Sequence, residues 1–251
     1  MLPAVGTLAC PRISLVVPAY NEEGYLPRLL DSVDRARARY AGGPDSVEVI
    51  VADNASTDGT ARVAAARGCR VVRVEKRVIG AARNGGGRAA RGDILAFIDA
   101  DSRIHPETFT EIERALQHPR IVAGATGAVP ERWSAGLVAT SAFLLFFALA
   151  LRVDIGVVFC RRADFEEVGG YTEEWMFAED VRFLLELRRL GRRRGQRLTR
   201  ATRARAIAST RKFDKYGDWH YITIPLRVGW DLLRRRAAIR TWAQMYWYED
   251  R

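Results

Sequence analysis

The chain has 251 residues, of which 48% are hydrophobic and 28% charged, and this composition excludes a disordered or fibrous protein. Its formal net charge of +10 comes almost entirely from arginine, with Lys76, Lys212 and Lys215 as the lysines. A charge of this sign favours a phosphate-bearing partner, and because no nucleic-acid-binding motif accompanies it, we do not expect RNA or DNA as that partner.

Much of the positive charge lies in one segment. Between Leu187 and Phe213 there are eleven Arg or Lys residues and no acidic residue. The segment suits the phosphates of a nucleotide or of lipid headgroups, and a solvated face in an arginine-rich chain explains it equally well.

The cysteines and the N-terminal residues bear on the cellular compartment. Cys10, Cys69 and Cys160 are odd in number, far apart and without the spacing of a metal site. They suit a reducing compartment better than a disulfide framework. The first residues also lack a basic stretch followed by an apolar one, which a secretory signal would have. We therefore expect a cytoplasmic protein.

Apolar runs alternate with helical patterns along the chain. Strands are expected over 13–20, 47–54, 69–75, 93–101, 121–129 and 156–160, and helices over 21–33, 56–68, 81–92 and 106–117. Alternation of this kind predicts an α/β fold, with a mostly parallel sheet and helices on both of its faces. Because no linker or repeat interrupts the pattern, a single domain over residues 1–251 is expected.

Polar residues follow three of these strands. "PAYNEE" comes after the first strand, "ADNASTDGT" after the second and "DADS" after the fourth. Ligands of open parallel sheets bind beyond the carboxyl ends of the strands, so the three clusters together predict a site at that edge. Taken singly, each cluster is also explained by helix capping or turn formation.

Asp99 and Asp101 stand at the end of the fourth strand. If the backbone is extended, residues two apart point to the same side, which brings two like charges together. A hard divalent cation such as Mg²⁺ relieves their repulsion and commonly binds one or two carboxylates together with substrate phosphates. The glycines at 85–87, near Arg83 and Arg88, favour either close approach to a phosphate or tight packing on the sheet.

An acidic pair begins the helical stretch near residue 180. Asp180 shares a helical face with the apolar Leu184 and Leu187, whereas Glu179 aligns with Arg182 and Glu186. We therefore expect Asp180 to project into a dry site, where a carboxylate is a better base. Helix capping by the two acids is the alternative interpretation.

In this order, the segments resemble the family 2 glycosyltransferases of the GT-A fold. The segments that carry the resemblance are 16–33, 49–64, 80–102, 159–191 and 209–221. The resemblance implies a metal-dependent, inverting transfer of a sugar from a nucleoside-diphosphate sugar to an acceptor hydroxyl or phosphate. It also implies a nucleotide-sugar-binding half over about residues 11–126 and an acceptor-binding half over about 127–251.

The resemblance also implies roles for individual residues. The nucleotide pocket would be lined by Pro18, Ala19, Tyr20 and Glu22, with Asp53 at the base and Arg83 near the diphosphate. Asp99 would approach the ribose or the metal, Asp101 would ligate Mn²⁺ or Mg²⁺, and Asp180 would be the catalytic base. Arg211 and Lys212 would close over the diphosphate, and His220 would be a third metal ligand or an acceptor contact.

The chain departs from the family pattern in three ways, the first of which is that "NGGG" at 84–87 is richer in glycine than usual. The second strand ends in "ADN" where two adjacent acids are usual, so only Asp53 can contact the base. No Q-x-x-R-W sequence occurs, which argues against processive synthesis.

Two other functions remain open: a sugar-1-phosphate nucleotidyltransferase, and a basic membrane- or nucleotide-binding protein without catalysis. The acidic "PAYNEEG" is unlike the basic, glycine-rich loop that the nucleotidyltransferase needs.

The uncharged residues 133–151 approach the length of a transmembrane helix. Asp101 and Asp180 lie on either side of this stretch and must meet at one site, which a single crossing would prevent. We therefore expect a buried helix, a homodimer contact or an interfacial helix. The last of these, with the basic segment, suits a cytoplasmic protein at the membrane surface acting on a lipid-linked acceptor.

Overall fold

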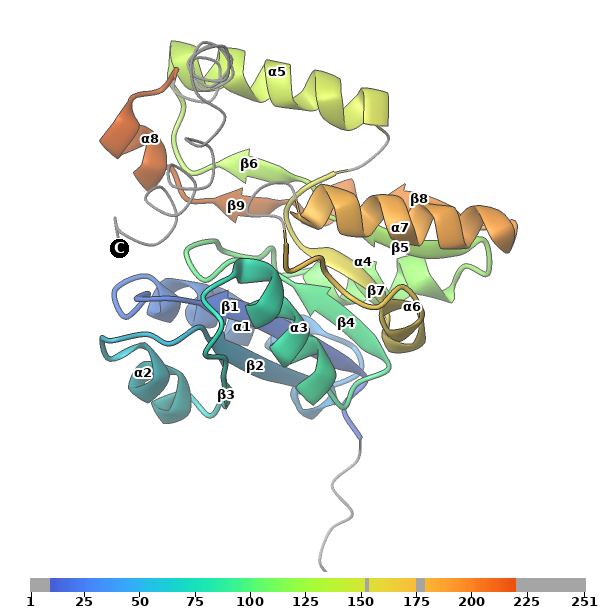
Figure 1. The fold of residues 1–251 in the computed structure, drawn as a ribbon, viewed down its shortest axis with the longest axis horizontal. Helices are drawn as coiled ribbons and strands as arrows, with labels where there is room; N and C mark the ends of the chain where they lie inside the picture. Colours follow the sequence, from blue (N-terminus) through green and yellow to red (C-terminus); the bar gives the residue numbers. More distant parts are fainter. Residues whose placement is uncertain (1–9, 152–153, 175–178, 220–251) are drawn as a thin grey trace, which may run out of the picture.

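The computed structural model describes residues 10–151, 154–174 and 179–219, with the backbone alone over 144–151. Its main sheet has seven strands in the order β3-β2-β1-β4-β7-β5-β8 (Figure 1). The strands are β1 (Ile13–Ala19), β2 (Val47–Asp53), β3 (Arg70–Arg73), β4 (Ile94–Phe97), β5 (Ile121–Ala125), β7 (Val158–Arg161) and β8 (Arg197–Arg200). Only β7 runs antiparallel to its neighbours within this sheet, so the predicted mostly parallel α/β architecture is confirmed.

Helices cover both faces of the main sheet. They are α1 (Leu26–Arg39), α2 (Thr60–Ala66), α3 (Ile79–Ala89), α4 (Thr108–Gln117), α6 (Arg162–Glu167) and α7 (Glu179–Arg193). Single turns of 3₁₀ helix, η1 (Pro44–Ser46) and η2 (Thr202–Ala204), precede β2 and β9. Because successive side chains of a strand point to opposite faces, a strand covered on both faces is apolar throughout.

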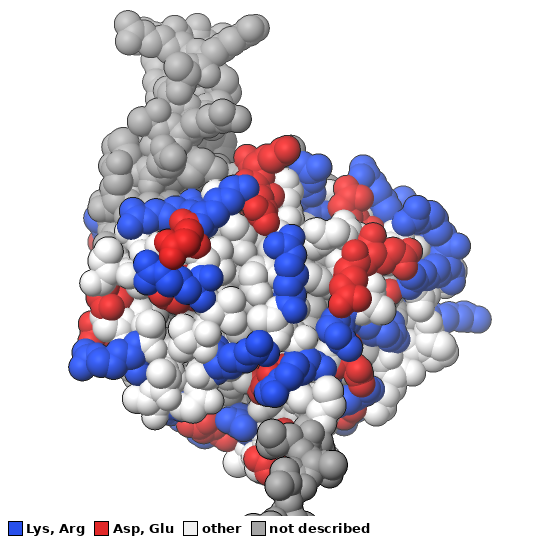
Figure 2. All heavy atoms as spheres, turned by 60° about the horizontal axis from the view of Figure 1, so that its bottom comes forward, with Lys and Arg blue, Asp and Glu red and all other residues white. Residues whose placement is uncertain are grey.

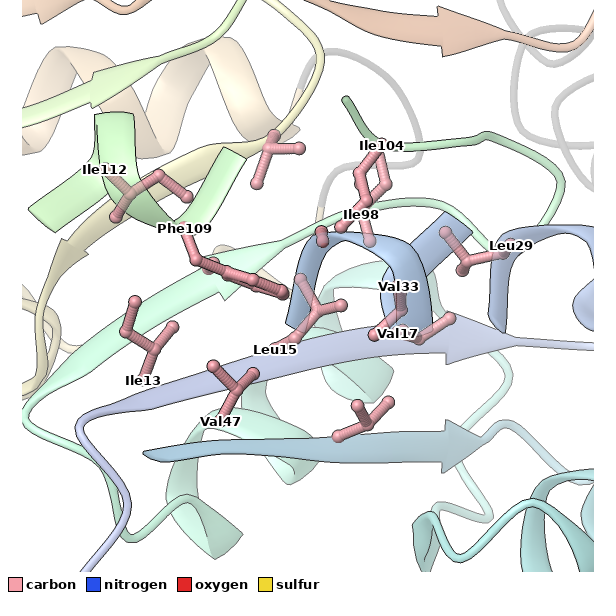
Figure 3. Close-up of a cluster of buried hydrophobic side chains, with 14 of the residues drawn as sticks. Ile13, Leu15, Val17, Leu29, Val33, Val47, Ile98, Ile104, Phe109 and Ile112 are labelled. Carbon is pink, nitrogen blue, oxygen red and sulfur yellow. The ribbon is translucent and has the colours of Figure 1, made fainter. Parts of the chain in front are cut away.

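The main sheet has a hydrophobic core on each of its faces, and the side chains of β1 point alternately into one core or the other. Ile13, Leu15 and Val17 face α1 and α4, and Figure 3 shows them among residues such as Leu29 and Phe109. Val16 faces the opposite way, into a second cluster that contains residues of α6 and α7. All seven residues of β1 are buried, and six of them are apolar; the exception, Ser14, donates its hydroxyl to Glu48 Oε1 at 2.5 Å.

The glycine run of α3 serves packing. A Cβ atom at Gly87 would lie 2.7 Å from Cζ of Phe165, and one at Gly86 would overlap the side chain of Val16. The missing side chains let α3 lie close to the sheet and to α6. Of the two interpretations of this run, tight packing is confirmed at these glycines.

A second layer lies above the edge of the main sheet in Figure 1. It consists of the parallel pair β6 (Ala128–Pro130) and β9 (Ala206–Ala208), with helices α5 (Ala135–Leu151) and α8 (Arg211–Tyr216). Arg132 pairs with Asp214 and Asp218, and Thr140 Oγ1 donates to the Asp218 carbonyl at 3.1 Å. These contacts join α8 and the residues that follow it to α5.

Helix α5 occupies most of the stretch 133–151 and has 17 residues. In the described part of the chain, no helix has both the length and the apolar character that a membrane crossing requires.

The charged residues are dispersed over the surface. Basic and acidic side chains alternate over the face shown in Figure 2 and form no single patch of one sign there.

Candidate functional site

The loops after β1 and β2 are joined to each other. Ala19 lies opposite Asp53 in the parallel ladder, so both strands end at the same level. Beyond them, the Asn21 N–H donates to Ser56 Oγ at 3.1 Å, and the Thr57 N–H donates to Asn21 Oδ1 at 2.9 Å. Asn21 has a φ of 52°, a left-handed conformation that asparagine tolerates. The predicted convergence of these two polar clusters is confirmed.

Asp53 and Asn54 have separate tasks at the end of β2, and both are 2% exposed. Asp53 Oδ1 accepts the Ser56 N–H at 3.1 Å. The Asn54 amide donates to the carbonyls of Val74 at 3.0 Å and Lys76 at 2.7 Å. A carboxylate cannot donate to two carbonyls, so this network requires the amide that Asn54 provides.

Residues in the loop after β3 lie beside the ends of β1 and β2. The guanidinium of Arg77 lies 5.2 Å from the ring centroid of Tyr20, within the range of a cation–π contact. Tyr20 itself is 8% exposed. We did not single out Arg77 from the sequence, because its proximity to Tyr20 arises from the loop that Asn54 secures and leaves no local signal in the sequence.

Asp99 and Asp101 do not share an extended strand. β4 ends at Phe97, and the Ser102 N–H donates to the Asp99 carbonyl at 3.1 Å, which closes a turn around both acids. The prediction that strand alternation sets their orientation was therefore wrong, because the backbone turns before Asp101. Each carboxylate instead faces a different guanidinium, that of Arg83 or that of Arg211.

Arg211 connects α8 to two of these acids. Its Nη atoms lie 2.8 and 2.5 Å from the two carboxylate oxygens of Glu22, and its Nε lies 3.0 Å from Asp101 Oδ2. The guanidinium also lies 4.6 Å from the ring centroid of Tyr25. Glu22 is 1% exposed, so the sheet edge and the second layer meet in a buried, charged contact.

Arg83 connects α3 to two further acids. Its Nη1 lies 2.6 Å from Glu179 Oε1, and its Nη2 lies 2.9 Å from Asp99 Oδ1. Burial alone would lower the pKa of Arg83, but the charges of Glu179 and Asp99 raise it well above its usual value. Burial raises the pKa of Glu179 to about 7, and the guanidinium of Arg83 only partly opposes this effect.

The order of burial at the start of α7 differs from our prediction. Glu179 is 5% exposed, whereas Asp180 is only half-buried, so the expectation that Asp180 occupies the drier position was wrong. Phe183, one turn after Glu179, is 1% exposed and extends the buried face to that side. The sequence predicts a role for Arg83 at the diphosphate, but no local pattern indicates that its guanidinium pairs with Glu179.

The remaining predicted site residues lie on β1, on α8 and outside the described part of the chain. Pro18 and Ala19 are buried at the end of β1, and Lys212 lies on α8 beside Arg211. His220 lies outside the described residues.

The Arg-rich segment begins towards the far end of α7, and a rise of about 1.5 Å per residue places Arg192 roughly 20 Å from Glu179. Part of its charge is neutralised locally, as in the pair formed by Arg194 and Asp164.

The acidic pair suits a hard divalent cation. Asp99 and Asp101 carry carboxylate oxygens, the atom type that such a cation prefers, and each already lies beside a cationic group of the protein. Mg²⁺ commonly takes one or two carboxylates and completes its shell with water and substrate phosphates. Within residues 10–151, 154–174 and 179–219, no three His, Cys, Asp or Glu side chains are grouped so that they could hold a metal ion on their own.

Comparison with solved structures supports the architecture. The fold is similar to that of S. aureus TarS residues 1–349 in complex with UDP-GlcNAc, at 20% identity and a TM-score of 0.62, over 79% of this chain and 58% of that one. It is also similar to glucosyl-3-phosphoglycerate synthase from Mycobacterium tuberculosis in complex with Mn²⁺, UDP and phosphoglyceric acid. Identity there is 26% and the TM-score 0.52, over 76% of this chain and 68% of that one.

Sequence relatives agree with the structural ones. The dolichyl-phosphate beta-glucosyltransferase of Drosophila melanogaster is 38% identical over 115 residues, which are 42% of this chain and 35% of that protein. The matches cover roughly a quarter to a third of the full length of the first relatives. Residues 14–240 match the family described as Glycosyl transferase family 2. Because this match spans most of the chain and the fold is the expected α/β architecture, the chain belongs to glycosyl transferase family 2.

Proposed function

We propose that this protein transfers a sugar from a nucleoside-diphosphate sugar to an acceptor hydroxyl or phosphate, with inversion at the anomeric carbon and without processivity. The observation that carries the proposal is the connection of the end of β4 to the start of α7. Arg83 makes this connection, because it contacts both Asp99 after β4 and Glu179 at the start of α7. Asp180 is therefore near the acids proposed to bind the donor.

The donor would lie along the ends of β1, β2 and β3. Pro18, Ala19 and Tyr20 would line the nucleotide pocket with Glu22, and Asp53 would contact the base. Asp53 is 2% exposed and held by the Ser56 N–H, so its carboxylate is fixed before any ligand binds. The cation–π contact with Tyr20 makes Arg77 a further candidate for a donor contact. Domain halves over residues 11–126 and 127–251 for donor and acceptor are part of this proposal.

Asp99 and Asp101 would hold Mn²⁺ or Mg²⁺ with the diphosphate, and His220 would be a third ligand or an acceptor contact. The chemistry that a bound divalent cation supplies is neutralisation of the departing diphosphate. The guanidinium of Arg83, already beside Asp99, would add positive charge near the diphosphate. Arg211 and Lys212 would add further charge from α8.

Asp180 would accept the proton of the acceptor hydroxyl. Glu179 is unsuited to this role, because its side chain is 7% exposed and its Oε1 lies 2.6 Å from the Arg83 guanidinium. Asp180 is half-buried and adjacent, so an acceptor has access to it. The proposed base is therefore the residue expected from the sequence, but accessibility rather than dryness is the reason.

Exposed side chains in the second layer support a lipid-linked acceptor and a peripheral position at the cytoplasmic face of a membrane. Trp133, before α5, is 61% exposed, and Trp219, after α8, is 53% exposed. Exposed tryptophans favour a membrane interface. A relative that acts on dolichyl phosphate, by its name, is consistent with this acceptor class. Co-sedimentation with anionic vesicles tests the position, and gel filtration tests the homodimer contact that α5 would alternatively provide.

A thermal-shift panel tests the donor site. The full chain is heated with UDP-, GDP- and dTDP-sugars, each with and without Mn²⁺. We expect one nucleotide to raise the melting temperature most, and more strongly with Mn²⁺, because ligands that bind only the folded state stabilise it. Stabilisation that does not depend on the metal would contradict the role of Asp101. Stabilisation by no sugar nucleotide would contradict the proposed function.

A further inference from the structure

The contact between Glu22, Arg211 and Asp101 is unequal on its two sides. Glu22 receives both terminal nitrogens of the guanidinium, whereas the Nε atom lies 3.0 Å from Asp101 Oδ2. The Glu22 side chain is 1% exposed and that of Asp101 is 16% exposed. A bidentate pair is the stronger of the two arrangements, and a fully buried carboxylate has a much higher cost without its partner.

The position of Arg211 is set from both layers of the molecule. Its guanidinium lies over Tyr25, just before α1, and its backbone begins α8. Asp218, after α8, pairs with Arg132 beside α5, at 2.6 Å. The guanidinium is therefore held at Glu22, and Asp101 lies at its more exposed edge.

We propose that Glu22 positions Arg211 as a built-in cation at Asp101, so that Arg211 and an incoming divalent cation compete for the Asp101 carboxylate. This inference rests on the proposed function only for the identity of Asp101 as a metal ligand. Without metal, Arg211 offsets the negative charge of Asp101. When a divalent cation binds, Asp101 exchanges its contact with Nε, and the bidentate pair with Glu22 remains.

Glu22 is therefore a positioning residue and Arg211 a competitor for Asp101, and the expected effect of removing Arg211 on metal affinity has an unusual sign. Removing a residue that merely supports a metal site weakens the binding of the metal. Removing a competitor strengthens it. The measurement therefore has to be of metal binding to the enzyme without nucleotide, where Arg211 is in place.

The test compares Mn²⁺ affinity between the full chain and its variants, from the electron paramagnetic resonance signal of free Mn²⁺. We expect Arg211→Gln to bind Mn²⁺ roughly tenfold more tightly than the unmodified chain, which corresponds to about 1.4 kcal/mol. Lys215→Gln removes the same charge from the same helix, four residues after Arg211, and we expect a much smaller change. This control measures the effect of net charge alone.

A second variant covers the case in which Arg211→Gln fails to fold because Glu22 is left unpaired. Glu22→Gln/Arg211→Gln replaces the buried pair with two neutral amides and leaves the net charge unchanged. We expect it to fold and to bind Mn²⁺ more tightly than the unmodified chain. If Glu22 were itself a metal ligand, this variant would bind Mn²⁺ more weakly, and the proposal would be overturned.

The remaining outcomes are also decisive. Equal Mn²⁺ affinity in all folded variants would show that Arg211 does not compete, and binding to none of them would overturn the competition as well. Thermal stabilisation by sugar nucleotides, measured on the same samples, separates these failures from that of the proposed function. A chain that responds to a sugar nucleotide without this competition keeps its donor site and loses only the competing role of Arg211.

Discussion

Arg83 and Glu179 are 96 positions apart in the chain and form a buried ion pair, with 2.6 Å between Nη1 and Oε1. The pair joins the middle of α3 to the first residue of α7. Because Arg83 also contacts Asp99 at 2.9 Å, the acids on the two sides of the site are connected through one guanidinium. The ring of Tyr171, 5.1 Å from the guanidinium, closes this arrangement.

The burial of Glu179 predicts a pH-dependent stability. Its pKa is raised from 4.5 to about 7, so the folded state binds the proton more tightly than the unfolded state does. This contribution to stability is complete below about pH 4.5 and is lost as the pH rises through about 7. In Glu179→Gln the contribution is absent at every pH.

The measurement is the free energy of unfolding in urea at pH 5 and pH 8. We expect the unmodified chain to lose up to about 3 kcal/mol more than Glu179→Gln between these values, since one pKa unit corresponds to about 1.4 kcal/mol. Glu186→Gln, on the same helix but more exposed, is expected to follow the unmodified chain. Parallel pH profiles for Glu179→Gln and the unmodified chain would contradict the raised pKa.

Replacing Asp180 separates catalysis from donor binding. We expect Asp180→Asn to lower kcat by about 10²–10⁴-fold, the usual contribution of a general base. The thermal shift with the preferred sugar nucleotide is expected to persist, because the variant keeps the size of the side chain and the partners of Arg83. Turnover is measured by release of the nucleoside diphosphate. Unchanged turnover would exclude Asp180 as the base, and Glu186→Gln again provides the control.

Asn54 allows a test of the hydrogen bonds that hold the loop after β3 in place. In Asn54→Asp a carboxylate would face the carbonyls of Val74 and Lys76, which now accept hydrogens from the amide. We expect a loss of at least about 2 kcal/mol in the free energy of unfolding at pH 8, from a buried acceptor without a donor. Asn54→Ala, which adds no charge, is expected to lose less. Both variants remove the donor, so equal stability would contradict the extra cost of placing a carboxylate against the two carbonyls.

The glycine run of α3 gives a prediction in which two effects oppose each other. In an exposed helix Gly→Ala stabilises by about 1 kcal/mol. At Gly86 the new Cβ overlaps the side chain of Val16, so we expect Gly86→Ala to destabilise by about 1–3 kcal/mol, as overpacking does. Gly24→Ala, where no atom lies within 4 Å, is expected to be nearly neutral. Thermal unfolding of both variants decides the matter, and a more stable Gly86→Ala would contradict the packing interpretation.

Much of the fold follows from the pattern of apolar residues. Buried strands such as β1 need a nearly continuous apolar run, and helices such as α1 need apolar residues on one face only. These local rules predicted the parallel half of the sheet and the positions of its loops. The antiparallel β7 and the pairing of β6 with β9 depend on contacts between distant segments, for which the local sequence carries no comparable signal.

The same division holds in the site. The sequence by itself determined which residues are available: the acids after β1, β2 and β4, the acidic pair that begins α7, and the arginines. Tertiary structure alone decided which arginine neutralises which acid, with Arg83 at Glu179 and Asp99, and Arg211 at Glu22 and Asp101. The physical reason is that a buried charge requires a partner within a few ångströms, and the partner here comes from 16 to 189 positions away.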